Sequence, residues 1–160
     1  MNLHRWLYRG GRPNRLASIV NSAWAAIHSL GILPNYLVTL EVTGRRTGRT
    51  IRLPLAMVAR GGERYLVSML GDDVAWVRNA RAAGGNVALK HGAREQVRLE
   101  EVPVELRAPI LQAYLRCAPG ARPHVPVDKG APLADFAKIA ARFPVFRVTA
   151  RTAGADAQQR

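Results

Sequence analysis

Apolar and polar residues alternate along the middle of the chain with the two-residue period of a β-strand. Between residues 36 and 43, one face carries the apolar residues Tyr36, Val38, Leu40 and Val42. The same alternation returns between residues 51 and 57, and a Gly61-Gly62 pair, which favours a tight hairpin, leads into an apolar run at residues 64–69. The pattern therefore predicts three consecutive antiparallel strands.

The following segment mixes helical and strand patterns. A short helix carrying Trp76 and Asn79 is expected next, and two further strands are expected at residues 86–91 and 94–102. These strands extend the antiparallel set.

Helical spacing returns after Pro103. The apolar residues that recur at three- and four-residue steps are Leu106, Ile110, Leu111, Tyr114 and Leu115. Pro109 is tolerated in such a helix only near its first turn. Four prolines between residues 118 and 133 predict a long surface loop, and a short helix and a last strand at residues 144–149 are expected after it.

An amphipathic helix is predicted before the first strand, at residues 15–30. Its apolar stripe consists of Leu16, Ile19, Val20, Ala23, Trp24, Ile27 and Leu30. Packing against the domain is the commoner use of such a helix and is the favoured interpretation. Trp6 and the preceding arginines also suit peripheral contact with a membrane surface, which stays open as an alternative.

Strands in short meanders, with helices at the ends and in one crossover, indicate an α+β fold built on a small barrel. The chain divides into a basic leader with the amphipathic helix at residues 1–33, a barrel domain at residues 34–150 and a loose tail at residues 151–160. No G-x-G-x-x-G motif, Walker A loop or zinc-type spacing of cysteine and histidine is present in the sequence, so no metal site is expected.

Composition adds a strong positive charge to this picture. The 160 residues contain 24 basic and 11 acidic side chains, for a formal net charge of +13. This surplus favours anionic ligands but does not indicate whether they are phosphates, carboxylates or lipid surfaces. The excess of arginine and alanine is also typical of GC-rich coding sequences. Nucleic acid is not expected, because few aromatic residues lie among the arginines to stack on bases.

Three absences in the sequence predict a cytoplasmic protein. Cys117 is the single cysteine and cannot form an internal disulfide. The sequence contains no apolar run of about 18 residues and no secretory signal pattern. A location at the inner face of the membrane would follow only if the amphipathic helix binds lipid.

The candidate ligand site is the segment TGRRTGR at residues 43–49, which lies between the first two predicted strands. Its glycines expose backbone N–H groups, and arginine guanidinium groups pair bidentately with phosphates and carboxylates. Arg52, in the second strand, lies close enough in sequence to join them. The alternative is a solvated hairpin whose arginines face water.

Four segments resemble the deazaflavin-dependent nitroreductase family, in the family's order and nearly its spacing. They are LEVTGRRTGRTIRLPL at residues 40–55, RYLVS at residues 64–68, WVRNARA at residues 76–82 and FPVFRV at residues 143–148. The resemblance implies a split β-barrel of the FMN-binding type, with about six antiparallel strands and peripheral helices. It also implies an oxidoreductase that uses coenzyme F(420), a deazaflavin hydride carrier, to reduce quinones, nitroaromatics or other activated double bonds.

The resemblance further implies which residues contact the coenzyme. The phosphate and acidic tail are expected on the turn, and the ring is expected against the following strand and under the tryptophan helix. The implied cofactor contacts are Arg45, Arg46, Thr47, Gly48, Arg49, Arg52, Pro54, Val67, Ser68, Met69, Trp76 and Asn79. Ala56 and His124 are candidate contacts for the substrate. No catalytic residue is expected, because hydride passes directly from a bound carrier.

Structural roles compete with several of these assignments. Trp76 is also typical of a core position, Asn79 of a cap, and His124 of an ordinary surface loop. The segment between Ser68 and Trp76 is shorter than in the family, and no tyrosine occurs at position 56 or between residues 118 and 127. Quinone reduction is therefore a broader expectation than nitroimidazole activation.

Two other classes of protein stay open at this point. FMN in the same barrel would satisfy the same arginines, as in the related pyridoxamine-oxidase-like proteins. A basic domain that binds anions or lipid without catalysis would explain the charge alone. The sequence leaves the physiological acceptor and the oligomeric state open.

Overall fold

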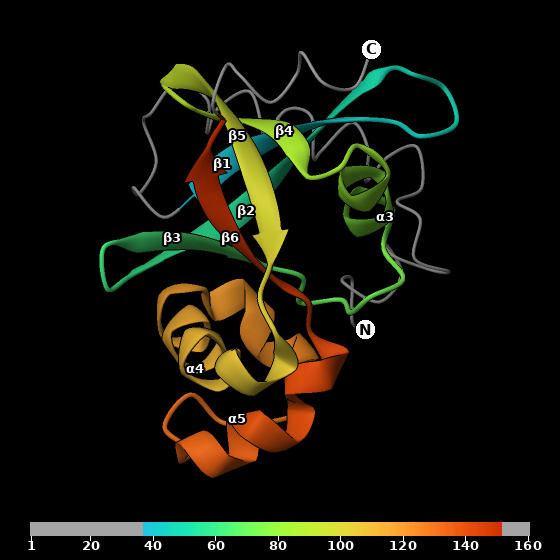
Figure 1. Ribbon diagram of the computed structural model, residues 1–160. Coiled ribbons are helices and arrows are strands. Elements are labelled where there is room, and N and C mark those ends of the chain that lie inside the picture. The colour runs from blue at the N-terminus through green and yellow to red at the C-terminus, as the bar shows by residue number, and fades with distance from the viewer. Residues whose placement is uncertain (1–36, 152–160) are drawn as a thin grey trace, which may run out of the picture.

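Six antiparallel strands close into a barrel in the order β1-β2-β3-β6-β5-β4 (Figure 1). The computed structural model describes residues 37–151. The strands are β1 (Leu37–Thr43), β2 (Thr50–Arg60), β3 (Glu63–Val67), β4 (Asn86–His91), β5 (Ala93–Glu101) and β6 (Val145–Ala150). The predicted α+β fold built on a split barrel is confirmed.

β2 is long enough to pair with two neighbouring strands. Its first part pairs with β1, with Leu53 opposite Leu40, and its last four residues pair with β3, with Met57 opposite Leu66. At the hairpin that follows, Gly61 and Gly62 both have positive φ, at 59° and 77°. Two left-handed residues in succession match the twist of the flanking strands, which explains the glycine pair.

The inward-facing residues of the barrel form one apolar cluster, closed at one end by α3 (Ala75–Ala82). Leu40, Leu66 and Val97 are among its fully buried members. From α3, Trp76, Val77 and Ala80 pack into the same cluster. The helix between β3 and β4 is therefore a plug for the barrel core.

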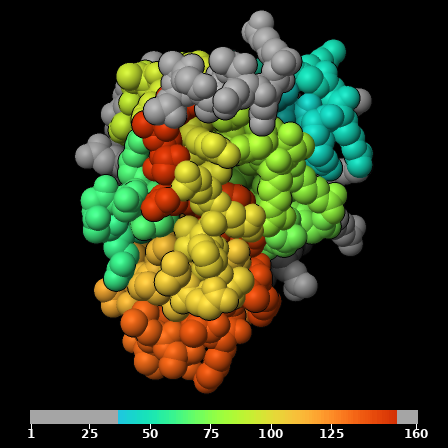
Figure 2. Space-filling view, in the orientation of Figure 1, coloured from blue at the N-terminus to red at the C-terminus, as the bar shows by residue number. Residues whose placement is uncertain are grey.

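A second cluster lies outside the barrel, beneath a group of helices that we call the helical cap (residues 104–142). The cap contains η2 (Val104–Leu106), α4 (Ala108–Cys117), η3 (Pro119–His124), α5 (Leu133–Ile139) and η4 (Ala140–Arg142). α4 packs on the outer face of β2 and β3, and the whole cap forms the lower lobe of the molecule in Figures 1 and 2. Val58, Val67 and Val145 are the strand residues buried against it.

Arg107 joins the cap to the barrel. This buried side chain donates hydrogen bonds to the carbonyl oxygens of Val102, Ala140 and Phe143 at 2.8, 3.2 and 3.4 Å. It also pairs with Glu101, and Glu101 in turn pairs with Arg81 of α3 at 2.6 Å. The plug helix and the cap are thus connected through one carboxylate at the end of β5.

The predicted strands and the helices at α3, α4 and α5 are confirmed to within a few residues. The predicted surface loop at residues 118–133 is wrong in its first part, because residues 119–124 form η3 and Ala118, Ala121 and Val125 are buried in the cap. Prolines exclude an α-helix here but allow a short 3₁₀ turn. The predicted amphipathic helix and most of the predicted loose tail lie outside the described residues.

Gly85 and Gly84 form a matched pair for testing the junction between α3 and the barrel. Both have positive φ, but a Cβ on Gly85 would lie 2.3 Å from the carbonyl oxygen of Leu99, whereas a Cβ on Gly84 would meet no atom within 4 Å. We expect Gly84→Ala to cost about 1–2 kcal/mol of unfolding free energy from backbone strain. Gly85→Ala should cost roughly 1–3 kcal/mol more, because the strand must move. Urea denaturation measures both, and equal losses would contradict the close contact.

Candidate functional site

The turn between β1 and β2 is held in one backbone conformation by its own hydrogen bonds. The Gly44 N–H donates to the Arg49 carbonyl, and the Gly48 N–H donates to the Gly44 carbonyl, both at 2.8 Å. Gly48 has a φ of +70°, and Gly44 is buried so tightly that a Cβ would lie 3.0 Å from Thr47 Oγ1. The two glycines of the predicted anion motif are therefore both required by the turn.

Asn79 of α3 clamps this turn to the barrel plug. Its Oδ1 accepts the backbone N–H of Arg45 at 3.1 Å and a guanidinium N–H of Arg45 at 2.9 Å. The Asn79 side chain is buried, with the residue 3% exposed. Because the amide oxygen is already used twice, Asn79 holds the turn in place. A direct contact between Asn79 and the cofactor stays a prediction.

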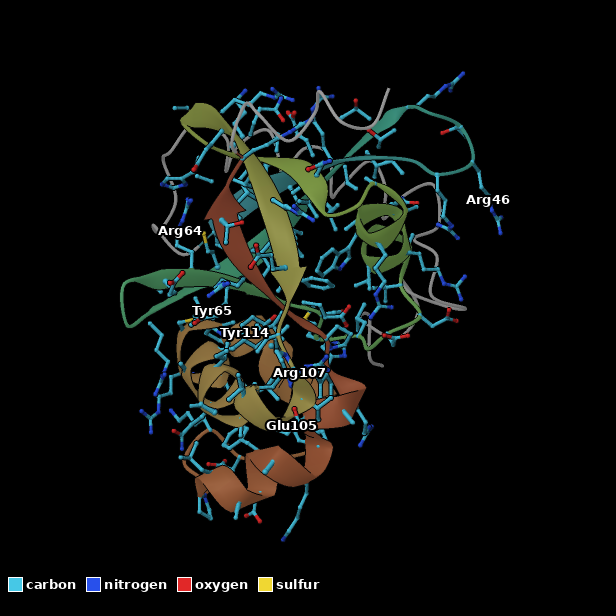
Figure 3. All side chains as sticks on the ribbon, viewed as in Figure 1. Arg46, Arg64, Tyr65, Glu105, Arg107 and Tyr114 are labelled. Atoms are coloured by element: carbon cyan, nitrogen blue, oxygen red, sulfur yellow. The ribbon has the colours of Figure 1, made fainter. Side chains whose placement is uncertain are left out.

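Arg46 and Arg49 are the exposed cations of the turn. Among residues 37–151, no carboxylate pairs with either guanidinium group. Figure 3 shows the Arg46 side chain directed away from the barrel. The backbone N–H groups of Arg46 and Thr47 also donate to no acceptor in the described part of the chain. Two cations and two free N–H groups on a rigid turn suit a phosphate or a carboxylate.

Arg52 has a partner that sequence reasoning did not anticipate. Its Nε donates to Oε1 of Glu41 at 3.1 Å, and the Nε of Arg94 donates to the other oxygen of the same carboxylate at 2.7 Å. The hydrogen bond from Arg94, with a smaller one from Arg52, holds the pKa of Glu41 below its usual value despite burial. Arg52 therefore stands beside the turn, on β2, as part of an ion cluster.

Arg52, Pro54 and Ala56 follow one another on the outer face of β2, whose inward positions are occupied by Leu53 and Leu55. This strip leads from the turn toward the helical cap, where Ala56 packs against the apolar cluster of the cap. Along this strip, the side chains on the outer face of β2 change from charged at Arg52 to apolar at Pro54 and Ala56. The predicted cofactor and substrate residues of β2 thus share one face.

Val67 and Met69 belong to the cap side of the barrel. Val67 is buried in the cap cluster at 2% exposure, and Met69 packs against the same cluster while partly exposed. The Ser68 hydroxyl donates to the Gly71 carbonyl at 2.6 Å and so fixes the loop before α3. Met69 is the member of this group with surface available for a ligand.

Trp76 is a core residue of the barrel. It is 8% exposed and meets the Phe146 ring edge-on, with ring centroids 5.5 Å apart and an interplanar angle of 60°. Its structural role is therefore clear, and a role as a wall for the cofactor stays a prediction.

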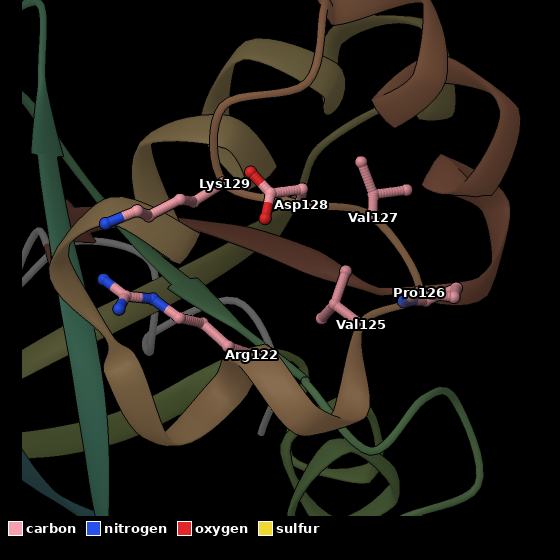
Figure 4. A pocket seen from close by; sticks show the side chains of 6 residues that line it. All are labelled: Arg122, Val125, Pro126, Val127, Asp128 and Lys129. Carbon is pink, nitrogen blue, oxygen red and sulfur yellow. The ribbon is translucent and has the colours of Figure 1, made fainter.

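His124 lies apart from the turn, at the end of η3 in the cap. Residues close to it in sequence line an open hollow of about 450 Å³ (Figure 4). The hollow is lined by Arg122, Val125, Pro126, Val127, Asp128 and Lys129. None of these residues is among the predicted cofactor contacts, so the hollow and the arginine turn are separate features.

Sequence reasoning missed Glu41, Arg94 and two tyrosines. Tyr65 packs against the cap cluster that also receives Ala56, and Tyr114 is buried within that cluster; Figure 3 shows the two rings between β3 and α4. The alternation of apolar and polar residues at positions 36–43 places Glu41 on the polar face of the strand, so the sequence gives no reason to expect that its carboxylate is buried. The sequence pattern indicates only an apolar helix position for Tyr114 and a strand position for Tyr65, so it gives no reason to place either in one cluster with Ala56.

Among residues 37–151 no helix is long and apolar enough to cross a bilayer, and no cluster of at least three potential metal ligands occurs there.

Comparison with solved structures supports the fold class. A structure described as F(420)-H(2) dependent reductase FDR-A aligns with a TM-score of 0.50 at 19% identity, over 73% of this chain and 96% of that chain. A structure described as a domain-swapped dimer aligns at 0.52 and 19%, over 83% and 98% of the two chains. A putative pyridoxamine 5'-phosphate oxidase from Listeria innocua aligns at 0.50 and 9%, over 83% and 94%. At these identities the likeness shows the fold alone.

The barrel and its neighbours thus place the protein in the split-barrel fold class. A family model described as F(420)H(2)-dependent quinone reductase matches residues 21–120, more than half of the chain. The protein belongs to this family of oxidoreductases, and its cofactor is coenzyme F(420). A comparison with curated proteins gave no significant match.

The residues of the turn fit the acidic part of this coenzyme. Deazaflavin coenzymes carry a phosphodiester and glutamate carboxylates. The guanidinium groups of Arg46 and Arg49 and the N–H groups of Arg46 and Thr47, which have no acceptor among residues 37–151, present donors to such anions. Gly48 lies at the tip of the turn, and nothing lies within 4 Å of a Cβ built there, so the surface beside the turn is open among the described residues. The turn is therefore the part of the described chain best suited to hold the coenzyme.

We expect Asn79→Ala to loosen the turn. The change leaves the partly buried Arg45 N–H without an acceptor, which costs about 1–3 kcal/mol of unfolding free energy. Hydrogen exchange at the Arg45 amide should become faster at the same time. Asn86→Ala is the control, since the structure shows no partner for the Asn86 side chain among the described residues. Unchanged exchange at Arg45 in Asn79→Ala would show that the clamp is not needed.

The ion cluster of Glu41, Arg52 and Arg94 should make the free energy of unfolding depend on pH. Because the pKa of Glu41 is lowered in the folded state, its contribution is fully present above the unfolded value of about 4.3 and is lost as the pH falls through the folded value. Glu41→Gln should therefore cost about 1–2 kcal/mol at neutral pH, and this difference should shrink toward zero as the pH falls below the pKa of Glu41 in the folded state. Urea titrations at several pH values measure the difference, and a constant gap would argue against an ionised Glu41 as the cause.

Proposed function

We propose that the protein transfers a hydride from reduced coenzyme F(420) to a quinone. The family supports a reductase that depends on this coenzyme, and the quinone is the acceptor in the family's description. When bound, the coenzyme supplies the hydride. The protein supplies a fixed position for the coenzyme and a surface for the acceptor.

The observation that carries the proposal is the rigid turn, whose cations Arg46 and Arg49 have no carboxylate partner in the described part of the chain. The backbone of the turn is fixed by its two internal hydrogen bonds and by the Asn79 clamp, so its donors are oriented before a ligand arrives. Preorganised donors bind anions with a smaller entropy cost than flexible ones. Arg46 and Arg49 would hold the phosphate and the first carboxylates of the coenzyme, and Arg45 would act mainly through the backbone it anchors.

The apolar end of the β2 strip is our candidate for the acceptor side. Ala56, Met69 and Tyr65 all pack against the cap cluster and keep partly exposed surface. Ala56 carries only a methyl group, so its side chain does not obstruct a flat ring on this surface. We therefore expect planar quinones to suit this surface, and nitroaromatic compounds to be secondary substrates.

Proton supply does not require a strong acid in this arrangement. Burial raises the pKa of Tyr114 above its usual value, so its hydroxyl stays protonated at neutral pH. In the described chain the site contains no pair of carboxylates arranged for acid–base chemistry. The contribution of the residues to the reaction is therefore positioning and exclusion of water.

The cellular setting is part of the same proposal. We expect a cytoplasmic protein, and peripheral contact of residues 1–33 with a membrane would bring it near lipid-soluble quinones. The basic leader Arg5, Arg9, Arg12 and Arg15 supports this expectation.

The double substitution Arg46→Ala/Arg49→Ala tests the proposal. We expect it to weaken binding of coenzyme F(420) by about tenfold to a hundredfold, because each charge-assisted hydrogen bond contributes roughly 1.5–3 kcal/mol, and less where it is exposed to solvent. Fluorescence titration measures the affinity. Turnover with the reduced coenzyme and a panel of quinone and nitro acceptors measures the activity, and quinones should be reduced fastest.

The matched control is Arg60→Ala/Arg116→Ala. It removes the same charge from exposed positions that have no side-chain partner among the described residues. An equal loss of affinity in both double variants would mean that only net charge matters. Wild-type protein that retains FMN on purification, or that oxidises the reduced coenzyme with no acceptor of the panel, would overturn the proposed function.

A further inference from the structure

Charged side chains join the loop before α3 to the helical cap. Arg81 of α3 donates through one terminal nitrogen to Asp72 of this loop at 2.7 Å. The same nitrogen and Nε donate to the two carboxylate oxygens of Glu101 on β5, at 2.6 and 3.2 Å. Glu101 also pairs with Arg107, at the base of the cap, at 3.4 Å. The ion pairs thus connect the loop, through α3 and β5, to the cap.

Hydrogen bonds to the main chain close this connection on its other side. Arg107 donates to the Phe143 carbonyl directly after the cap, and the next carbonyl along the chain, that of Pro144, accepts the Ser68 N–H at 2.9 Å. The Ser68 hydroxyl donates to the Gly71 carbonyl within the loop. We call residues 68–74 the junction loop, and the side chains that hold it the junction network: Ser68, Asp72, Arg81, Glu101 and Arg107.

The junction loop lies against the end of the cap. Gly71 has a φ of 95°, and a Cβ built on it would lie 3.5 Å from the Arg142 carbonyl oxygen. Met69 packs against the cap cluster and keeps partly exposed surface, and Leu70 is 42% exposed. A movement of the loop or of the cap would therefore change the apolar surface around Met69, which belongs to the proposed acceptor side.

α3 makes contacts toward both parts of the proposed site. Asn79 reaches the β1–β2 turn, and Arg81 reaches Asp72 and Glu101. Residues two positions apart in an α-helix are separated by about 200° around its axis, so these contacts leave the helix on opposite sides. One short helix therefore fixes the turn on one side, and the junction loop and the cap on the other.

Stability alone does not explain the junction network. The side chains of Arg81, Asp72 and Glu101 are 37%, 66% and 36% exposed, and exposed ion pairs contribute little to stability. What they add is orientation, because a planar guanidinium group that donates to two carboxylates fixes both in direction and distance. The network therefore has the geometry of a support for the junction loop.

We propose that Arg81 and Glu101 are positioning residues, which hold the junction loop and the cap in register with the turn. The inference rests on the proposed function and deepens it, because the surface that they hold around Met69 is the one offered to the acceptor. Both act through the loop, and the turn is fixed separately by Asn79. Loss of the network should therefore reduce turnover and leave the affinity for the coenzyme unchanged.

The test compares Glu101→Gln with Glu100→Gln. Glu100 is the preceding residue of β5, is 43% exposed and pairs with Arg147 of β6 at 2.7 Å. Each substitution removes one negative charge from the end of the same strand and weakens ion pairing there. Only Glu101→Gln interrupts the junction network, so Glu100→Gln is the matched control.

The first measurement needs no coenzyme. Carbon-13 methyl labelling of methionine gives one signal for Met69 and one for Met57, which packs against the barrel cluster. In Glu101→Gln the Met69 signal should shift or broaden while the Met57 signal stays in place. In Glu100→Gln both signals should keep their positions. An unchanged Met69 signal in Glu101→Gln would overturn the inference.

The second measurement separates binding from turnover. In Glu101→Gln, kcat with reduced coenzyme F(420) and a quinone should fall about fivefold to twentyfold, because small displacements of bound reactants lower the rate steeply. Fluorescence titration should show an affinity for the coenzyme within about twofold of wild type. Asp72→Asn interrupts the network at the loop and should lower kcat in the same direction. It decides the matter if thermal melting shows that Glu101→Gln does not fold.

The outcomes separate this inference from the proposed function. Equal kcat in Glu101→Gln and Glu100→Gln, or a loss of coenzyme affinity as large as the loss of kcat, would overturn the positioning role while turnover by wild-type protein still supports the proposed function. Wild-type protein that reduces no acceptor would overturn the proposed function instead, and the Met69 signal would still show whether the network holds the loop.

Discussion

The site depends on the acceptance of two hydrogen bonds by one buried amide oxygen. Asn79 Oδ1 binds the backbone and the guanidinium of Arg45, and so attaches the β1–β2 turn to the helix that plugs the barrel. Without this contact, a turn rich in glycine and arginine would be flexible and would lose conformational entropy when it bound an anion. Because of the clamp, the turn is already ordered when the domain folds. Arg46 and Arg49 then stand on an ordered backbone without a carboxylate partner among residues 37–151.

The arginines of this chain have different structural roles, although all carry the same guanidinium group. Arg45 anchors the turn, Arg107 satisfies buried carbonyl groups between barrel and cap, and Arg52 and Arg94 are held by Glu41. Arginine suits all of these roles because its planar guanidinium group carries several N–H donors that point in fixed directions. The net charge of +13 therefore includes arginines that make structural contacts within the fold.

Local patterns were sufficient to predict the barrel, because alternation and paired glycines act within a few residues. They also located the turn, whose glycines are required by its backbone. The tertiary contacts could not be predicted: Glu41 meets Arg94 across 53 positions, and Asn79 meets Arg45 across 34. The 3₁₀ helix at residues 119–124 was missed because its prolines indicate a loop, while burial of Ala121 and Val125 depends on packing within the cap.

A crystal structure with coenzyme F(420) bound is the most direct test of the central claim. The account predicts that the phosphate lies within hydrogen-bond distance of the backbone N–H groups of Arg46 and Thr47, with the guanidinium groups of Arg46 and Arg49 around it. Density for the acidic arm elsewhere, for example in the hollow at residues 122–129 of the cap, with the turn free of ligand, would contradict it.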